Sequence, residues 1–219
     1  MTLLSDYINN DFKALKIDEL VPKVQDFFEE INFSHFPVLE NDTYIGSISR
    51  NELETFDFDK NLSDYKYSFE SFFTRENSVL LEVLEVFSKN HSNLIPVLND
   101  DNKYLGYYEI EEVIKTFQET PFLSESGNII IVKKAILDYS MSQIAQIIES
   151  NNGKLLGIYV SNSDLNSVEI TLKINVGDIN DIIQSFRRYN YEIVSNHQQD
   201  DYISILKENA NYLEKYLSM

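Results

Sequence analysis

The chain has 219 residues, 43% of them hydrophobic and 25% charged, with a formal net charge of −18. This composition is typical of a globular protein with one large domain or two modest ones. The acidic excess argues against nucleic acid and membranes as partners, because Lys and Arg supply most of the affinity for phosphates. The absence of cysteine excludes disulfides, thiolate catalysis and Cys-based metal sites. With no secretory signal and no apolar run of membrane-spanning length, we expect a cytoplasmic protein.

The first predicted elements are a helix, two strands and a second helix. Apolar residues recur at a spacing of three and four, which predicts one buried helix face, at Val21, Val24, Phe28 and Ile31. Two short apolar runs follow at residues 35–39 and 44–48, separated by turn-forming residues, and they predict a β-hairpin. Ser49 then offers a hydroxyl suited to the N-terminus of a closing helix.

The same order returns about 59 to 60 residues later. A second apolar helix face is predicted by Leu80, Val83, Leu84 and Phe87. Residues 94–98 and 104–108 repeat the hairpin, and residues 109–113 begin another helix. Pro37 and Pro96 coincide between the copies, at the predicted start of a strand, where a missing amide hydrogen is tolerated. Gly46 and Gly106 also coincide, which predicts a close approach of another backbone.

At these residues the chain resembles a tandem pair of CBS domains, with one repeat at residues 1–60 and another at residues 61–120. The resemblance implies a mixed α/β fold in which two repeats pack about a pseudo-twofold axis. It also implies clefts between the repeats that often bind adenosine-containing ligands. CBS pairs usually dimerise and pass the ligand state to a partner or to an attached domain.

Nucleotide-binding members commonly show Gly, two apolar residues, Ser or Thr, two variable residues and Asp. The resemblance assigns the hydroxyl to the phosphates and the Asp to the ribose. In the first copy these two positions hold Ser49 and Glu52, and in the second they hold Glu109 and Glu112. The alternative interpretation is that Ser49 and Glu52 only cap a helix. The candidate ligand-binding residues are His35, Pro37, Ser49, Arg50, Glu52, Pro96, Glu109 and Glu112.

The carboxylates among the candidate residues limit the negative charge that we expect the ligand to carry. A carboxylate about 4 Å from a phosphate charge costs roughly 1 kcal/mol in water and about 4 kcal/mol at an effective dielectric of 20. We therefore expect an adenosine-containing ligand with little net negative charge, such as AMP, adenosine or S-adenosylmethionine, or one that arrives with Mg²⁺. No other cofactor and no resident metal site is indicated by the sequence.

The last third predicts a separate small domain after a linker at residues 121–127. Apolar patterns give the order βαββαβ across residues 128–197, which is the ferredoxin-like sandwich. Within it, residues 155–160 read as a buried strand, and Ser140 is a candidate helix cap. A C-terminal helix is expected over residues 198–219, with an apolar seam suited to docking on the same chain or on a second subunit.

The order and size of this domain resemble an ACT domain. A CBS pair followed by an ACT-like domain resembles the acetoin-utilisation B-type proteins. ACT domains that bind amino acids usually carry a Gly, often after Asp-x-Pro, in the loop before the first helix. The corresponding loop, residues 138–141, has neither Pro nor Gly, so a structural or dimerising role is an equal alternative.

The residues indicate no enzyme. His35, His91 and His197 are scattered, and there is no phosphate-cradling Gly-rich loop and no nucleophile elbow. Two hypotheses remain for a protein that we expect to be a homodimer with an unidentified protein partner. One is a ligand-sensing regulator, and the other is an adaptor whose clefts have lost their ligands.

Overall fold

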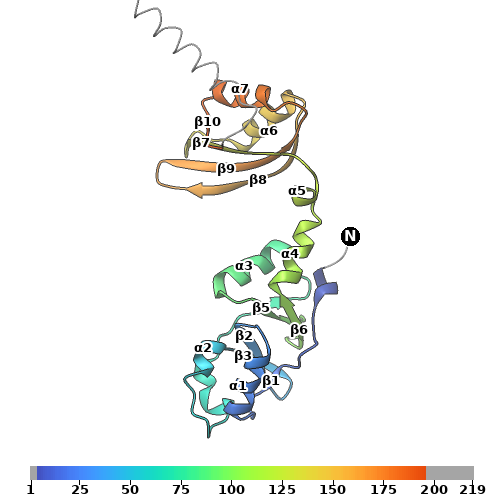
Figure 1. The fold of residues 1–219 in the computed structure, drawn as a ribbon, viewed down its shortest axis with the longest axis vertical. Helices are drawn as coiled ribbons and strands as arrows, with labels where there is room; N and C mark the ends of the chain where they lie inside the picture. Colours follow the sequence, from blue (N-terminus) through green and yellow to red (C-terminus); the bar gives the residue numbers. More distant parts are fainter. Residues whose placement is uncertain (1–3, 196–219) are drawn as a thin grey trace, which may run out of the picture. The chain divides into compact units, whose positions relative to one another are not determined.

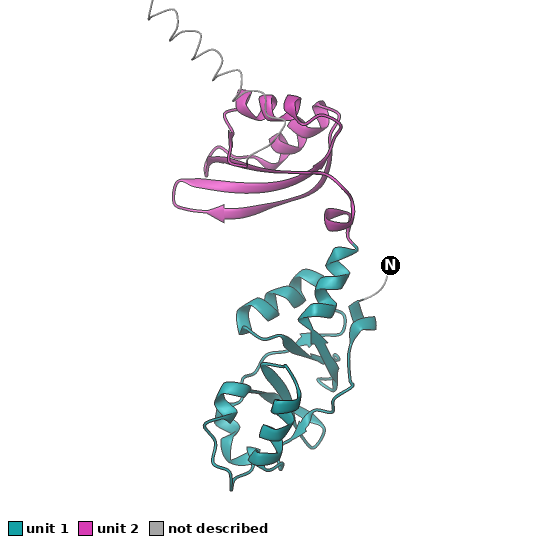
Figure 2. Cartoon of the chain, in the orientation of Figure 1, with its two compact units in different colours: residues 1–119 teal, residues 120–219 magenta. Residues whose placement is uncertain are grey.

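The computed structural model describes residues 4–195. The chain divides into two compact units, residues 1–119 and residues 120–219 (Figure 2). Both units combine helices with β-sheet, as the sequence predicts. Within the described residues, no helix is long and apolar enough to cross a membrane.

The first repeat of unit 1 contains a three-stranded sheet and two helices (Figure 1). Its elements, after the short 3-10 helix η1 (Leu4–Tyr7), are β1 (Leu15–Lys16), α1 (Val21–Glu30), β2 (His35–Glu40), β3 (Thr43–Ser49) and α2 (Arg50–Leu53). Strand β2 lies in the centre, parallel to β1 and antiparallel to β3. The predicted apolar face of α1 is buried, including Ile31 just beyond its end.

The second repeat has the same order of elements as the first, and it forms a separate three-stranded sheet with the same arrangement of strands. Its elements are the 3-10 helix η2 (Leu62–Ser68), β4 (Thr74–Arg75), α3 (Leu80–Asn90), β5 (Leu94–Leu98), β6 (Tyr104–Glu109) and α4 (Ile110–Gln118). Strand β5 is parallel to β4 and antiparallel to β6. The register of each hairpin shifts at the same place, after Val38 in one repeat and after Val97 in the other.

The hairpins follow from local sequence. Asn41 and Asp42 join β2 to β3 with φ angles of 49° and 63°, which is the geometry of a type I′ turn. Side chains of Asn and Asp tolerate this left-handed backbone better than most other residues do.

The prolines are placed differently from the sequence-based expectation. Pro37 and Pro96 are the third residues of β2 and β5, so the prediction that they start strands is wrong. Pro37 lies opposite Ser47 and Pro96 lies opposite Tyr107. The backbone N–H and C=O groups of Ser47 and Tyr107 point away from the prolines and bond to other segments, so the prolines are tolerated there. The missing amide hydrogen of each proline therefore leaves no gap in the hairpin ladder.

Each repeat receives a backbone segment from the N-terminal part of the other repeat. Ser47 exchanges two backbone hydrogen bonds with Glu70, both of 2.8 Å. Tyr107 exchanges two with Asn9, of 2.8 and 2.9 Å. Gly46 and Gly106, with φ of 145° and 155°, lie next to these bridges, where an added Cβ would collide with the incoming segment. The predicted close backbone approach is therefore confirmed.

The hydrophobic cores show the same exchange of segments. Leu62 is fully buried in the core of the first repeat, although it follows that repeat in the sequence. Leu4, Tyr7 and Ile8 belong to the first repeat in sequence but pack against the core of the second. The cores of unit 1 thus cross the linear division at residue 60, and each repeat depends on residues outside its own sequence range.

Equivalent positions of the two repeats also meet each other directly. Ser34 precedes β2 and Asn93 precedes β5, and three hydrogen bonds join these two residues. At the other end of the hairpins, Thr43 forms a β-bridge with Lys103. Contacts between positions related by the repeat offset are what an approximate twofold axis produces.

Unit 2 is an antiparallel sheet with helices α6 and α7 on one face (Figure 1). Its elements are α5 (Pro121–Ser124), β7 (Asn128–Ala135), α6 (Met141–Ser150), β8 (Lys154–Ser163), β9 (Ser167–Asn175), α7 (Asn180–Arg188) and β10 (Glu192–Ile193). The strand order β10-β7-β9-β8 is the ferredoxin-like arrangement that the sequence predicts. The core is formed by alternate residues of β7 and β9 together with the inner faces of both helices.

One strand of unit 2 differs from its sequence-based prediction. Residues 155–160 were expected to form a buried strand, but β8 is half-buried at its start and exposed from Tyr159 to Ser163. It is the edge strand of the sheet and has a neighbour on one side only. The C-terminal helix expected over residues 198–219 lies outside the described residues.

Candidate functional site

A cavity of about 480 Å³ opens between the two repeats of unit 1, and we call it the His35 cleft. Its volume falls within the range of about 300–1,000 Å³ that is usual for small-molecule sites. The cleft is lined by Asn32, Phe33, Ser34, His35, Ser49, Arg50, Asn51, Glu70, Asn90, His91 and Asn93. Both repeats contribute, so a ligand in this cleft would contact each of them.

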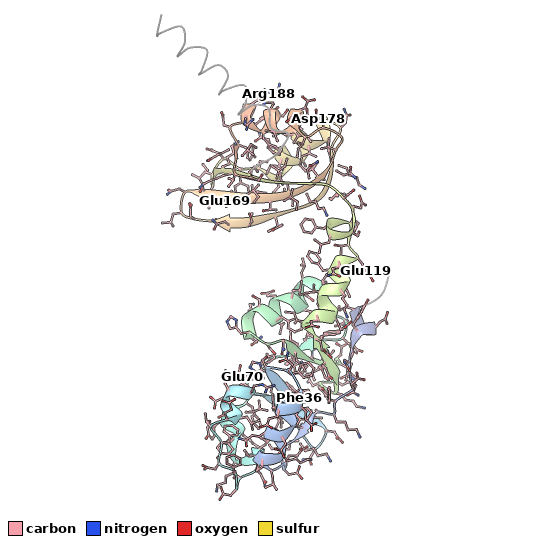
Figure 3. All side chains as sticks on the ribbon, viewed as in Figure 1. Phe36, Glu70, Glu119, Glu169, Asp178 and Arg188 are labelled. Carbon is pink, nitrogen blue, oxygen red and sulfur yellow. The ribbon has the colours of Figure 1, made fainter. Side chains whose placement is uncertain are left out.

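His35 is 92% buried by residue surface, with 8% of its area exposed, at the first position of β2. Its Nδ1 lies 2.9 Å from the hydroxyl of Ser34, and its Nε2 lies 3.2 Å from a carboxylate oxygen of Glu70. The ring of Phe72 packs edge-on against it, with the centroids 5.4 Å apart. Figure 3 labels Glu70, which is held in place by its backbone bridge to Ser47.

Ser49 and Arg50 lie together at the start of α2. The Ser49 hydroxyl accepts a hydrogen bond of 3.2 Å from the backbone N–H of Glu52, so Ser49 is the N-cap of the helix. The Arg50 guanidinium donates to the carbonyl oxygens of Ile31, at 2.6 Å, and Phe33, at 3.4 Å. These bonds connect the end of α1 to the start of α2 and also fix the guanidinium at the wall of the cleft.

The other candidate residues are not part of this lining. Glu52 is exposed on α2, and only its backbone meets Ser49. Pro37 and Pro96 are buried inside their strands. Glu109 accepts a 2.7 Å hydrogen bond from the side-chain amide of Asn9, and Glu112 forms an ion pair with Lys115. Of the eight candidates, the structure brings together His35, Ser49 and Arg50.

Residue-by-residue reasoning missed Ser34, Glu70 and Asn93, which connect the cleft to both repeats. Ser34 and Asn93 occupy equivalent positions, one residue before the strands that carry the prolines. Residues beside a pseudo-twofold axis must meet their own counterparts, so the repeat offset contained a usable signal for this pair. For Glu70 no such signal exists, because its place depends on a bridge between segments far apart in sequence.

A half-buried tyrosine bonds to the segment that follows Glu70. The hydroxyl of Tyr44 donates to the carbonyl of Phe72 at 2.7 Å and lies 3.0 Å from the Ser47 hydroxyl. Burial raises the pKa of Tyr44 to about 12, and the nearby carboxylate of Glu70 acts in the same direction. Tyr44 is therefore neutral at physiological pH, and its hydroxyl holds the segment between Glu70 and β4 through the carbonyl of Phe72.

In unit 2, the loop before α6 ends on Ser140, whose hydroxyl accepts a hydrogen bond from the backbone N–H of Gln143. The predicted cap is thus confirmed. A backbone N–H group at the N-terminus of α6 is therefore bonded to a side chain of the protein itself. The preceding loop, residues 138–141, contains no glycine. Among the described residues, no group of three or more His, Asp or Glu side chains is arranged to hold a metal ion.

The CBS domain family model matches residues 4–56 and 70–119. Comparison with curated proteins gives no match. A CBS domain pair/ACT domain protein from Thermotoga maritima is 16% identical, with a TM-score of 0.49, over 54% of this chain and 98% of its own. CBSX2 in complex with AMP is 16% identical, with a TM-score of 0.46, over 54% and 98%. The cytosolic domain of the Mg²⁺ channel MgtE in complex with ATP is 14% identical, with a TM-score of 0.44, over 50% and 46%.

The family match covers both halves of the internal repeat. It ends where the first compact unit ends, at Glu119. Two repeats with the same strand order and the same hairpin irregularity occupy the matched residues. The N-terminal unit of this protein has the fold of a tandem pair of CBS domains, and the CBS domain family model matches each of its two repeats.

Proposed function

We propose that this protein is a cytoplasmic, non-catalytic regulator whose His35 cleft binds an adenosine-containing ligand with little net negative charge. Ligand binding changes how the two CBS domains pack, and a protein partner or a second copy of the chain reads that change. The observation that supports this most is the position of the cavity. It is lined by polar side chains from both domains, so its occupant contacts both sides of the domain interface.

The charges of the cleft favour a ligand with few phosphates. Arg50 is the only Lys or Arg in the lining, and Glu70 is the only carboxylate. Arg50 Nη2 already donates to two backbone carbonyls, so the cleft offers the remaining N–H groups of one guanidinium, enough for a single phosphate but not for a triphosphate. Four Asn side chains line the same cavity, and amides can both donate to and accept from a base and ribose hydroxyls.

Isothermal titration calorimetry with the full chain tests the proposal. Adenosine, AMP and S-adenosylmethionine are compared with metal-free ATP and with ATP plus Mg²⁺. We expect adenosine or S-adenosylmethionine to bind more tightly than metal-free ATP, and His35→Leu to weaken binding. Gln146→Ala, on the surface of unit 2, is the matched control and should bind as the wild type does. Tighter binding of metal-free ATP would contradict the charge argument.

The second candidate is an adaptor that binds no small molecule. This candidate is favoured because several polar side chains of the cleft already form hydrogen bonds within the chain. They are Ser34, His35, Arg50 and Asn93. A thermal-shift screen separates the two candidates. A ligand at 100 times its dissociation constant stabilises the folded state by about 2.7 kcal/mol, so a panel without any shift would favour the adaptor.

We also propose that unit 2 is an ACT-like domain that supports a homodimer, in the arrangement of the acetoin-utilisation B-type proteins. The strand order and the capped helix α6, with no glycine in its preceding loop, support a dimerising role over amino-acid binding. Light scattering coupled to size-exclusion chromatography measures the mass in solution. A monomer at tens of micromolar would overturn the homodimer, and a thermal shift with amino acids would overturn the structural role.

A further inference from the structure

One hydroxyl group connects the buried imidazole of the cleft to the contact between the two CBS domains. The Ser34 hydroxyl lies 2.9 Å from His35 Nδ1 and 3.1 Å from Asn93 Oδ1. The backbone N–H of Asn93 donates to the same hydroxyl oxygen, at 3.2 Å, and the backbone N–H of Ser34 donates to Asn93 Oδ1, at 2.8 Å. We call these bonds between Ser34 and Asn93 the Ser34–Asn93 clasp.

The hydroxyl of Ser34 has one hydrogen and can donate it in one direction only. When His35 is neutral and its Nε2–H donates to Glu70, Nδ1 is an acceptor and takes the Ser34 hydrogen. When His35 is protonated, both ring nitrogens are donors, so Nδ1–H donates to Ser34. The Ser34 hydrogen is then released to donate to Asn93 Oδ1. The protonated form has one more hydrogen bond across the domain interface than the neutral form has.

We propose that His35 is a proton-sensing residue whose protonation strengthens the Ser34–Asn93 clasp and so regulates the packing of the two CBS domains around the His35 cleft. The proton comes from solvent, through the side of the ring that borders the cleft. Imidazole is the side chain whose unperturbed ionisation lies closest to neutral pH, so pH is the variable to change in the test. As regulation of the ligand site, this inference rests on the proposed function, but the proton response itself needs no ligand.

The groups that face His35 come from four segments. Glu70, in the segment before β4, accepts a hydrogen bond from the ring. Arg50, at the start of α2, lines the same cleft, and its guanidinium donates to the carbonyls of Ile31 and Phe33. His91, at the end of α3, lines the opposite wall. Tyr44 in β3 is uncharged at physiological pH.

The chain supplies its own control for the role of the imidazole. In the second repeat the equivalent of His35 is Leu94, which is fully buried at the start of β5. The variant His35→Leu therefore introduces a side chain that the same strand position already accepts. A second variant, Ser34→Ala, keeps the imidazole and its pair with Glu70 but removes the hydroxyl. A third, His91→Gln, removes the other titratable ring of the cleft.

The experiment is amide hydrogen exchange followed by NMR on the ligand-free full chain at about pH 6 and about pH 8. The protection factor of the amide at residue 34 reports on the clasp, and each rate is divided by that of an unstructured peptide at the same pH. One net hydrogen bond corresponds to an increase of about twofold to tenfold in protection at the lower pH. We expect this increase in the wild type and in His91→Gln, and none in His35→Leu or Ser34→Ala.

Equal protection at both pH values in the wild type would overturn the inference. A pH response that persists in Ser34→Ala would also overturn it, because the effect would then come from charge alone and not from the hydroxyl. Calorimetric titration with adenosine at the same two pH values keeps this failure separate from that of the proposed function. If adenosine does not bind while the exchange response is present, the proposed ligand falls and the proton switch stands.

Discussion

Gly106→Ala is the sharpest test of the exchanged segments in the CBS pair. Gly106 has a φ of 155°, and an added Cβ would lie 2.4 Å from the backbone oxygen of Asn9 and 2.8 Å from a methyl group of Ile8. The nearest obstacle is backbone, so it cannot move aside as the end of a flexible side chain can. We expect the N-terminal segment to separate from β6.

The magnitude follows from what that separation removes. The two backbone hydrogen bonds between Asn9 and Tyr107 contribute about 1 kcal/mol each. The left-handed backbone adds a strain of about 1–2 kcal/mol for an alanine. The free energy of unfolding of unit 1 should therefore fall by about 3–4 kcal/mol.

Urea denaturation followed by circular dichroism measures the loss, and hydrogen exchange of the Asn9 and Tyr107 amides locates it. The control is Gly177→Ala, where an added Cβ meets no atom within 4 Å and the expected change is within about 0.5 kcal/mol. If Gly106→Ala unfolds at the same urea concentration as the control, the exchanged-segment arrangement is wrong.

Three further predictions concern capping, ionisation and the independence of the two units. Ser49→Ala removes the N-cap of α2 and should cost about 1 kcal/mol of unfolding free energy in urea denaturation, with unchanged stability refuting the cap. Because folding raises the pKa of Tyr44 to about 12, its stabilisation is complete below about pH 10 and is lost as the pH rises through 12. Tyr44→Phe should therefore remove part of this alkaline loss of stability, and an unchanged pH profile would count against it. Ile170→Ala, in the core of unit 2, should cost about 2–5 kcal/mol there, without altering the exchange rate of the Asn9 amide.

The elements of unit 1 could be predicted because each is specified locally. The helix faces follow from apolar residues at spacings of three and four, and the first hairpin follows from Asn41 and Asp42, which tolerate positive φ. The repeat offset added what a single copy could not supply, since coincident glycines pointed to a backbone approach at Gly46 and Gly106.

The parts that could not be predicted depend on long-range packing. Pro37 is accepted inside a strand because Ser47 bonds to Glu70, and no local pattern identifies that partner. The exposure of β8 has the same origin, because residues 155–160 are as apolar as those of a central strand. Only the strand order places them at the edge of the sheet.

The candidate site was predicted in part, for a related reason. His35, Ser49 and Arg50 belong to elements that adjoin in sequence or pair in a hairpin, so local reasoning could group them. Glu52 holds the position where the resemblance places a ribose-binding Asp, but it is the third residue of α2, and its side chain is not part of the lining. The cleft is completed by Glu70 and Asn93, which are brought in by the other repeat.

The two repeats allow each cleft position to be compared with its own counterpart. In the first repeat, His35 pairs in register with Ser49 and reaches Glu70 on the incoming segment. At the equivalent place in the second repeat, Leu94 pairs with Glu109, which instead accepts a 2.7 Å hydrogen bond from Asn9.

In both repeats a hydrogen bond to a carboxylate thus joins a strand to the incoming segment, but the positions of donor and acceptor are reversed. The first repeat uses a donor on its strand that can gain and lose a proton, whereas the second uses an amide that cannot. Each junction is closed by a hydrogen bond, and the second is closed without an imidazole. The presence of His35 at one junction only is therefore better explained by a function of the His35 cleft than by the stability of the CBS pair.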